Sequence, residues 1–394
     1  MTDGANDNHG IYLDYQATTP LEPRVLDAML PHFSALGNPH SSRHDHGIAA
    51  MAAVDAARAQ VAAAIGARPD EIVFTSGATE ANNLAVKGVL ASSNRNGVVA
   101  LATEHHAVLD VVLAMGRRGA RSAVVGVDAD GIVDLDALSR AVDDGTALVS
   151  AMAANNEIGV LQPLPEISRI AKAAGALLHT DAAQAVGKIP FDVGAAGIDL
   201  ASISSHKLYG PVGIGALYIS REAGRRISPI LEGGGQERGF RSGTLPVALC
   251  VGFGEACRIS IESMAQEAEN LRGLRQAFID RLGELGVVFA INGTMEQRIP
   301  GNLNVSFDGV DAEALLMRLR GKVSVASGSA CTSDSLDPSH VVMALGLGPD
   351  RAEEAIRVGF GRFTTIDEVL MAAKTIGEAV AKLRRVGYNR IKGA

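Results

Sequence analysis

A lysine near the middle of the chain follows a run of hydroxyl-bearing residues at the end of a predicted strand. Residues 202–207 read Ser-Ile-Ser-Ser-His-Lys, and a Gly-Pro turn follows at 210–211. A lysine enclosed in a site loses its proton more easily and can attack a carbonyl carbon to form a covalent link. A lone lysine in a turn is more often exposed to solvent. The chemistry of Lys207 therefore depends on its companions in the fold.

An acidic residue ends a second predicted strand. Asp181 follows the apolar run Ala176–Thr180, and Gln184 lies nearly one helical turn beyond it. Ligands of open parallel sheets bind beyond the carboxyl ends of the strands. An acid there can hold a protonated ring nitrogen by a charge-assisted hydrogen bond, and Gln184 can donate to a ring oxygen. A helix cap for the following segment is an equally open interpretation of these residues alone.

A third stretch has the composition of an anion-binding helix start. Residues 75–80 read Thr-Ser-Gly-Ala-Thr-Glu and join a predicted strand to a predicted helix. Gly77 permits a tight turn, after which the backbone N–H groups of Ala78 and Thr79 point out of the helix N-terminus. A plain N-cap at Ser76 or Thr79 is the alternative. The glycine and lysine spacing of a Walker loop or a dinucleotide fingerprint is absent.

Taken together, these three stretches indicate one cofactor. A phosphate cradle, an acid at one strand end and a lysine at another are the groups that a pyridoxal phosphate (PLP) site requires. None of the three is specific alone. A parallel sheet would gather them at the edge where its strands end, and we therefore predict that the chain binds PLP.

The three cysteines of the chain differ in their surroundings. Cys250 and Cys257 lie seven residues apart in a predicted helix. That spacing is about 10 Å along the axis at about 1.5 Å per residue, which exceeds disulfide reach, so we expect two small core residues. Cys331 lies among Ser and Gly residues, in a stretch typical of a mobile loop. A small odd number of cysteines indicates a reducing compartment.

Short apolar runs alternate with helical patterns over most of the chain, and this alternation predicts the sheet that positions these residues. It is typical of a mostly parallel sheet with helices on both faces. The closely spaced strands Leu200–Ser205 and Ile214–Ile219 predict one antiparallel strand. The other strands expected here are Glu71–Thr75, Val98–Ala102, Arg121–Val127, Leu148–Ala153 and Ala176–Thr180, with helices at Ala78–Leu90, His106–Gly116 and Leu164–Ala174.

The pattern changes after a long predicted helix, Leu245–Leu282, in which we expect a bend. The strands expected beyond it are Val287–Ile291, Leu303–Phe307 and Val323–Ala326, and the helices are Glu313–Leu319, His340–Leu345 and Asp367–Arg384. This mixture predicts a smaller α+β domain. We expect an N-terminal segment 1–15 that packs with the small domain, a large PLP-binding domain 16–260, and a small domain 261–394 that carries the Cys331 loop.

Composition excludes several classes of protein. The formal net charge of −8 and the lack of a clustered basic face argue against nucleic acid or an anionic membrane as a direct partner. No apolar stretch approaches the length of a membrane span, and residues 1–10 lack the pattern of a signal peptide. We expect a cytoplasmic protein. A metal site at His40, His44 and His46 is a weak alternative, because no compact ligand set accompanies them.

The blocks that carry this chemistry also carry a family resemblance. The chain resembles a cysteine desulfurase of the NifS/IscS type, within the class V aminotransferases and the type I PLP fold. Seven blocks in the same order as in that family, from about residue 11 to about residue 366, carry the likeness. They lie at residues 12–20, 37–47, 103–105, 155–159, 204–207, 241–244 and 327–333.

The resemblance implies a role for each matching residue at the cofactor ring. Lys207 would carry the cofactor covalently, and Asp181 would pair with its pyridinium nitrogen. Gln184 would contact the ring oxygen. His105 would stack on the ring and move protons, and Asn156 would lie beside both the ring and the substrate.

The resemblance also assigns the phosphate, the substrate and the second subunit. Thr244 would reach the phosphate from the partner in a homodimer, and Arg357 would pair with the substrate carboxylate. The remaining phosphate contacts would come from Ala78, Thr79, Ser204 and His206.

Cys331 decides the reaction that the resemblance implies. L-Cysteine would be the substrate, L-alanine the product, and the sulfur would stay on Cys331 as a persulfide. A sulfur-acceptor protein, either an iron–sulfur scaffold or another carrier, would then take the sulfur. The chain ends soon after its last predicted helix, so we expect no long docking tail, and the acceptor stays open.

Two other functions share part of this evidence. A selenocysteine lyase or an aminotransferase would use the same lysine, acid and phosphate cradle. A non-enzymatic scaffold that binds a sulfur-assembly partner would bind no PLP. Three positions depart from the family pattern: Gln16 and Ala326 replace other small polar residues, and Gly359 stands where a serine is usual.

Overall fold

A computed structural model describes residues 10–328 and 338–392 of the chain. Cys331 therefore lies outside the described residues. Among these residues, no helix has the length and apolar character needed to cross a membrane. The helices are α1 (Pro23–Ser34), α2 (Asp45–Ala63), α3 (Ala78–Ser92), α4 (His106–Arg117), α5 (Leu135–Ala141), α6 (Leu164–Ala173), α7 (Val247–Glu284), α8 (Ala312–Leu319), α9 (His340–Ala344), α10 (Pro349–Glu353) and α11 (Ile366–Lys392).

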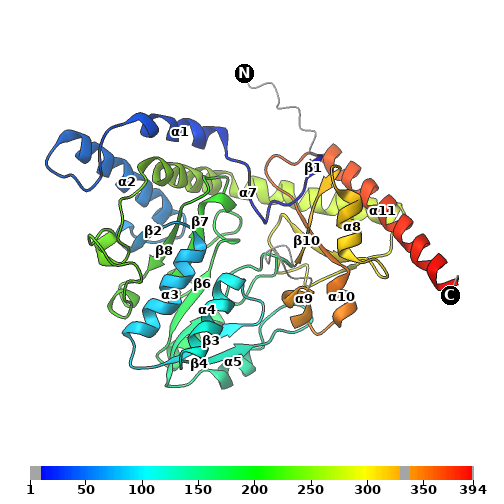
Figure 1. The fold of residues 1–394 in the computed structure, drawn as a ribbon, viewed down its shortest axis with the longest axis horizontal. Helices are drawn as coiled ribbons and strands as arrows, with labels where there is room; N and C mark the ends of the chain where they lie inside the picture. Colours follow the sequence, from blue (N-terminus) through cyan, green and yellow to red (C-terminus); the bar gives the residue numbers. More distant parts are fainter. Residues whose placement is uncertain (1–9, 329–337, 393–394) are drawn as a thin grey trace.

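A seven-stranded sheet forms the centre of the larger part of the molecule (Figure 1). Its strands lie in the order β2-β8-β7-β6-β5-β3-β4. Strand β8 runs antiparallel to both of its neighbours, and the other pairs are parallel. The predicted mostly parallel sheet with one antiparallel strand is confirmed. The strands are β2 (Ile72–Thr75), β3 (Gly97–Leu101), β4 (Arg121–Val125), β5 (Thr146–Ser150), β6 (Leu177–Asp181), β7 (Leu200–Ser204) and β8 (Gly215–Ile219).

Apolar side chains cover both faces of this sheet. In β3, Val98 and Ala100 pack in one cluster with residues of α3 and α4, while Val99 and Leu101 pack in another with residues of α2, α6 and α7. Successive side chains of a strand point to opposite faces, so a continuous apolar run is what a strand buried on both faces needs. This packing holds the carboxyl ends of the strands in place.

A smaller sheet lies at the other end of the molecule, in the order β12-β13-β10-β9, and all of its pairs are antiparallel. Strand β1, near the N-terminus, pairs in parallel with β11, and Leu13 packs in the same cluster as the small sheet. The predicted domain boundaries stay predictions. The strands are β1 (Ile11–Tyr12), β9 (Ala290–Ile291), β10 (Asn302–Ser306), β11 (Val323–Ser324), β12 (Ala326–Ser327) and β13 (Ala355–Gly359).

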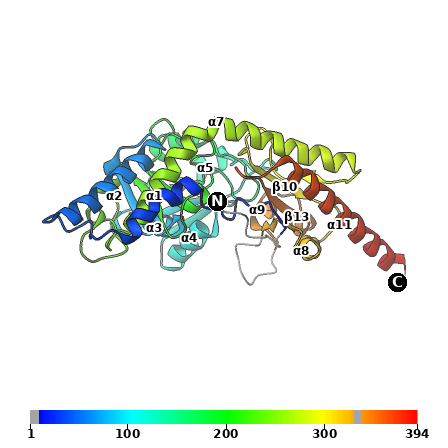
Figure 2. The same ribbon diagram turned by 90° about the horizontal axis from the view of Figure 1, so that it is seen from above.

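Helix α7 connects the two parts. Its first half contributes Cys250, Phe253 and Cys257 to the core of the large sheet, and its second half contributes Leu271 and Phe278 to the core of the small sheet. Figure 2 shows the helix extending along both parts. The expectation that both cysteines are core residues is confirmed, because each is almost fully buried.

Several elements are absent from the sequence prediction. Helices α1, α2, α5 and α10 and strand β13 were not expected. Helix α2 is rich in alanine, which gives little contrast between a buried and an exposed face. The packing of α2 against α7 nevertheless requires small residues, because a Cβ at Gly254 of α7 would lie 2.7 Å from the Cα of Ala57 in α2. Small residues here mark close helix packing, a contact between segments far apart in the sequence.

Buried charges close one edge of the large sheet. The carboxylate of Glu237 accepts hydrogen bonds from Arg58 at 2.6 and 2.8 Å and from the backbone N–H of Phe74 in edge strand β2 at 2.7 Å. Arg58 and Arg238 both donate to the carbonyl of Ile72, at 2.8 and 2.7 Å. Unpaired backbone N–H and C=O groups at a sheet edge can pair with a strand of another chain. In β2, these side chains form hydrogen bonds with the backbone groups instead.

We expect Glu237→Gln to destabilise the protein by about 3 kcal/mol or more, because it leaves the buried Arg58 without its opposite charge. The matched control is Glu269→Gln, which removes one partner of an exposed pair with Arg272 and should cost less than about 0.5 kcal/mol. Denaturant unfolding of both variants measures the difference. Equal losses would contradict the account.

Two of the departures from the family pattern are in contact. A Cβ at Gly359 would lie 1.9 Å from Oε1 of Gln16, and the Nε2 of Gln16 donates to the carbonyl of Gly301 at 2.9 Å. The longer side chain of Gln16 therefore occupies the space that a serine at 359 would need. The backbone N of Tyr15 would lie 2.8 Å from the same Cβ, so the fit is tight on two sides.

We expect Gly359→Ser to cost about 1–3 kcal/mol of stability through overpacking. Added to Gln16→Ser, the same change should cost less, with a coupling of about 1 kcal/mol between the two sites. Gly273→Ser is the control, since a Cβ there meets nothing within 4 Å. Thermal and denaturant unfolding of the unmodified protein, the two single variants and the double variant measure this coupling. If the two losses of stability simply add, the coupling is refuted.

Candidate functional site

One cavity lies beyond the carboxyl ends of the central strands. Its volume is about 440 Å³, which suits a small cofactor together with a substrate. Ten residues that the sequence analysis singled out line it: Ala78, Thr79, His105, Asn156, Asp181, Gln184, Ser204, His206, Lys207 and Arg357. The fold thus brings together side chains that lie up to 279 residues apart in the chain, from Ala78 to Arg357.

Lys207 enters the cavity from the turn that follows β7. Its Nζ donates to the carbonyl oxygens of Gln16 and Ala17, at 2.5 and 2.7 Å. Thr19, in the same N-terminal stretch, donates its hydroxyl to the carbonyl of His206 at 2.9 Å. The N-terminal segment therefore positions the lysine, a function that the sequence analysis did not assign to it.

Asp181, at the end of β6, is held by two donors. The Nδ2 of Asn82 donates to Oδ2 at 2.8 Å, and the backbone N–H of Ala183 donates to Oδ1 at 3.0 Å. Asn82 is fully buried in α3, and its Oδ1 has no partner among the described residues. Asn82 stands beside Asn83 in the sequence, and residue type alone does not show that the first is buried and the second only partly so.

Behind Asp181, the side chains are kept neutral. Burial and the nearby charge of Asp181 raise the pKa of Glu104 well above its usual range. Burial lowers the pKa of His179 to about 4, against the opposing effect of Asp181. His179 lies between the hydroxyls of Ser150 and Ser202, each 2.9 Å from a ring nitrogen. The negative charge at this end of the sheet is therefore concentrated on Asp181.

His105 lies at the start of α4, where its Nδ1 accepts the backbone N–H of Ala107 at 3.0 Å. Burial lowers its pKa, with Asp181 acting in the opposite direction. The neutral ring then carries its proton on Nε2, because Nδ1 is used as an acceptor. A neutral imidazole of this kind can stack on a ring and exchange a proton through Nε2.

The start of α3 offers an anion site. No side chain caps this end, and the space where a Cβ of Gly77 would point is open for 4 Å. Exposed N–H groups at a helix N-terminus attract phosphate. Ser204 and His206 line the same cavity. Burial, followed by the charge of Lys207, lowers the pKa of His206 to about 4.

Arg357 lies on β13 of the small sheet and reaches into the cavity. Its Nη2 pairs with the carboxylate of Asp14 at 2.7 Å, and its Nη1 donates to the carbonyl of Asn156 at 3.1 Å. Its Nε is buried without a partner among the described residues. Asp14 was part of a family block but had no assigned role, and the structure shows that it orients this guanidinium.

The other two predicted site residues are not in this cavity. Thr244 is exposed and is not among the residues that line it. Cys331 lies outside the described residues. The family resemblance assigns Thr244 to the phosphate site of a partner subunit, and that assignment stays a prediction.

The residues present fit PLP. An uncapped helix start matches a phosphate, the carboxylate of Asp181 matches a protonated ring nitrogen, and the amine of Lys207 lies in the same cavity. The buried Nε of Arg357, which has no partner among the described residues, is a donor left over for a ligand.

Comparison with known proteins agrees with this geometry. The family model described as aminotransferase class-V matches residues 11–371. Cysteine desulfurase IscS of Rickettsia bellii (strain OSU 85-389) is 47% identical over 377 residues, which are 95% of this chain and 92% of that protein. A solved NifS-like protein superposes with a TM-score of 0.87 at 36% identity, covering 94% of this chain and 99% of that one.

A second solved structure, described as SspA in complex with cysteine, has a TM-score of 0.79 at 32% identity and covers 90% of this chain and 100% of that one. These likenesses extend over nearly the whole chain. The expected type I PLP fold is confirmed. The chain belongs to the class V aminotransferase family of PLP-dependent enzymes, among its cysteine desulfurases.

Proposed function

We propose that this protein releases sulfur from L-cysteine and holds it as a persulfide on Cys331. The observation that carries the proposal is the convergence of Lys207, Asp181, the α3 N-terminus and Arg357 on one cavity. The membership of the family and the likeness to cysteine desulfurases support the same reaction. L-Alanine is the second product.

Bound PLP supplies an electron sink for the bonds at the substrate Cα. Ala78, Thr79, Ser204 and His206 would hold its phosphate, and Asp181 would fix the proton on its ring nitrogen. Gln184 would donate to the ring oxygen. Lys207, released from its covalent role, would take the Cα proton of the substrate.

The substrate is oriented by its carboxylate. Arg357 would bind it bidentately, because this guanidinium is held in place by Asp14 and by the carbonyl of Asn156. His105 would lie over the ring with its Nε2 proton available.

The thiol that takes the sulfur is Cys331 by exclusion as well as by resemblance. Burial raises the pKa of Cys250 to about 12 and that of Cys257 still further, and a buried thiol of this kind is unreactive. The Cys331 thiolate attacks the substrate sulfur, an S–S bond forms, and the Cβ–S bond breaks with its electrons going to carbon. Protonation at Cβ completes L-alanine, so no external oxidant is required.

We expect Cys331→Ser to abolish persulfide and alanine formation while PLP binding stays unchanged. Lys207→Ala should abolish both the activity and the covalent, coloured form of the cofactor. Cys257→Ser is the control and should keep full activity. The measurements are visible absorbance, alanine, and persulfide labelling after L-cysteine. Undiminished sulfur transfer without Cys331 would point to a lyase or another reaction on the same fold.

A homodimer completes this proposal. Leu26, Leu30 and Phe33 project from one face of α1, and Leu36 follows, with exposed fractions from 41% to 76%. A contiguous apolar face of this kind marks an interaction surface. Thr244, exposed on this chain, would then contribute to the partner's phosphate site.

A cytoplasmic location fits the need to keep Cys331 as a free thiol.

We expect the double variant Leu30→Glu with Phe33→Glu to shift the protein from dimer to monomer. Met317→Glu is the control: it puts a charge on a residue of 78% exposure in α8 and should leave the dimer intact. Sedimentation velocity gives the oligomeric state, and a monomeric unmodified protein would overturn the proposed dimer.

Thr244→Ala should weaken PLP binding without dissociating the dimer.

A further inference from the structure

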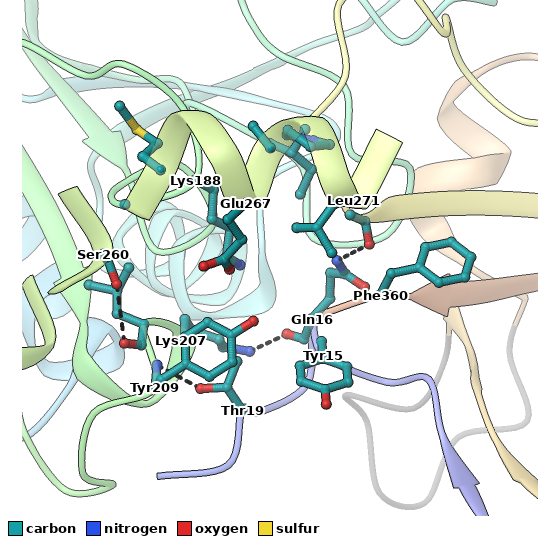
Figure 3. Close-up of a pocket in the computed structure, with 17 residues that line it drawn as sticks. Tyr15, Gln16, Thr19, Lys188, Lys207, Tyr209, Ser260, Glu267, Leu271 and Phe360 are labelled. Carbon is teal, nitrogen blue, oxygen red and sulfur yellow. Dashed lines mark hydrogen bonds between the residues drawn. The ribbon is translucent and has the colours of Figure 1, made fainter. Parts of the chain in front are cut away.

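A second, smaller cavity lies on the far side of Lys207. Its volume is about 20 Å³, room for a single water molecule. Gln16 and Lys207 line both this cavity and the main one, so they form the wall between them. Figure 3 shows Lys188 and Glu267 on the side of this cavity away from Tyr15. No role has been assigned so far to Lys188.

Lys188 contacts the main site through one side chain. Its Nζ donates to Oε1 of Gln184 at 2.5 Å, and the Nε2 of Gln184 donates to the carbonyl of Gln16 at 2.9 Å. Both neighbours specify the same amide orientation, because an amine nitrogen faces the oxygen and a carbonyl oxygen faces the nitrogen. The direction of the second N–H of Gln184 is thus fixed by Gln16, in the wall of the main cavity, and by Lys188, which lies outside it.

We propose that Lys188 is a positioning residue, which fixes the orientation of the Gln184 amide so that its second N–H is directed to the cofactor ring oxygen, and whose protonated form adds positive charge behind Lys207. The proposal rests on the proposed function, since it concerns a cofactor joined to Lys207. Lys188 touches neither cofactor nor substrate. It acts through Gln184 and through its charge.

The surroundings of Lys188 are consistent with this role. The residue is partly exposed along its length, while its amine end is enclosed by protein. Burial lowers its pKa to about 7, the charges of Lys207 and Arg357 act in the same direction, and Glu267 opposes them. The other titratable or charged groups nearby are Tyr15 and Tyr209, which line the cavity, and Arg362, which pairs with Glu267 at 2.8 Å.

Two substitutions separate the hydrogen bond from the charge. Lys188→Met removes both and keeps the length of the side chain, whereas Lys188→Gln keeps a donor for Gln184 and removes the charge. In Lys188→Met we expect PLP to dissociate roughly tenfold faster, as for a lost hydrogen bond to a charged group. The pH midpoint of the visible band of the bound cofactor should rise by up to about half a unit, because the protonated form of Lys188, populated below its pKa of about 7, no longer opposes a proton on the nitrogen of Lys207.

The Gln variant should retain slow PLP dissociation and show the shifted midpoint. The decisive comparison uses Gln184→Met: adding Lys188→Met to it should leave the dissociation rate unchanged if Lys188 acts through Gln184. Full additivity of the two effects on dissociation would overturn the proposal. Lys374→Met, at an exposed position of α11, is the control for the loss of a lysine.

The outcomes also distinguish this proposal from the proposed function. If the unmodified protein shows no visible band that depends on Lys207, the proposed function fails. If the band is present but Lys188→Met behaves like Lys374→Met in dissociation and midpoint, only the role of Lys188 is refuted. Circular dichroism and thermal unfolding of each variant report whether it is folded. A loss of fold in Lys188→Met moves the test to Lys188→Gln, whose unshifted midpoint would refute the charge effect.

Discussion

The negative charge of Asp181 at the end of β6 is the constraint on which the site depends. A buried carboxylate needs donors around it, and Asn82 from α3 and the backbone of Ala183 supply them. Burial, together with the charge of Asp181, raises the pKa of Glu104 well above its usual range and favours its neutral form. The same charge favours protonation of whatever nitrogen lies opposite, so a pyridinium ring nitrogen becomes the natural partner.

Different parts of the protein supply the other groups of the site. The strand ends of the large sheet supply Asp181, Ser204 and Lys207, and the uncapped start of α3 supplies backbone donors for a phosphate. The small sheet supplies Arg357, held by Asp14. Cofactor binding and substrate binding therefore come from different sheets, and the site requires both parts of the molecule to be packed together.

Helix α7 and the N-terminal segment fix the positions of the large and small sheets relative to each other. The helix contributes side chains to both cores. The N-terminal segment pairs with β11 through Ile11 and Tyr12, and its residues 16–19 hold the turn that carries Lys207. The carbonyl of Gln16 meets both Lys207 and Gln184. A shift of the Gln16 backbone would therefore move both Lys207 and Gln184. Gln16 is also the residue that contacts Gly359, the other of the two coupled departures from the family pattern.

Much of this was determined by the sequence alone. The apolar alternation predicts the parallel sheet, because strands buried on both faces must be apolar throughout. Lys207, Asp181 and the 75–80 stretch predict the cofactor, because each ends or follows a strand and such ends meet at one edge. Tertiary structure alone decided the rest: Asn82 at Asp181, Asp14 at Arg357, Lys188 behind Gln184 and the Ala-rich α2 against α7. These contacts join segments distant in sequence, and neither periodicity nor residue type specifies which partner a buried polar group will find.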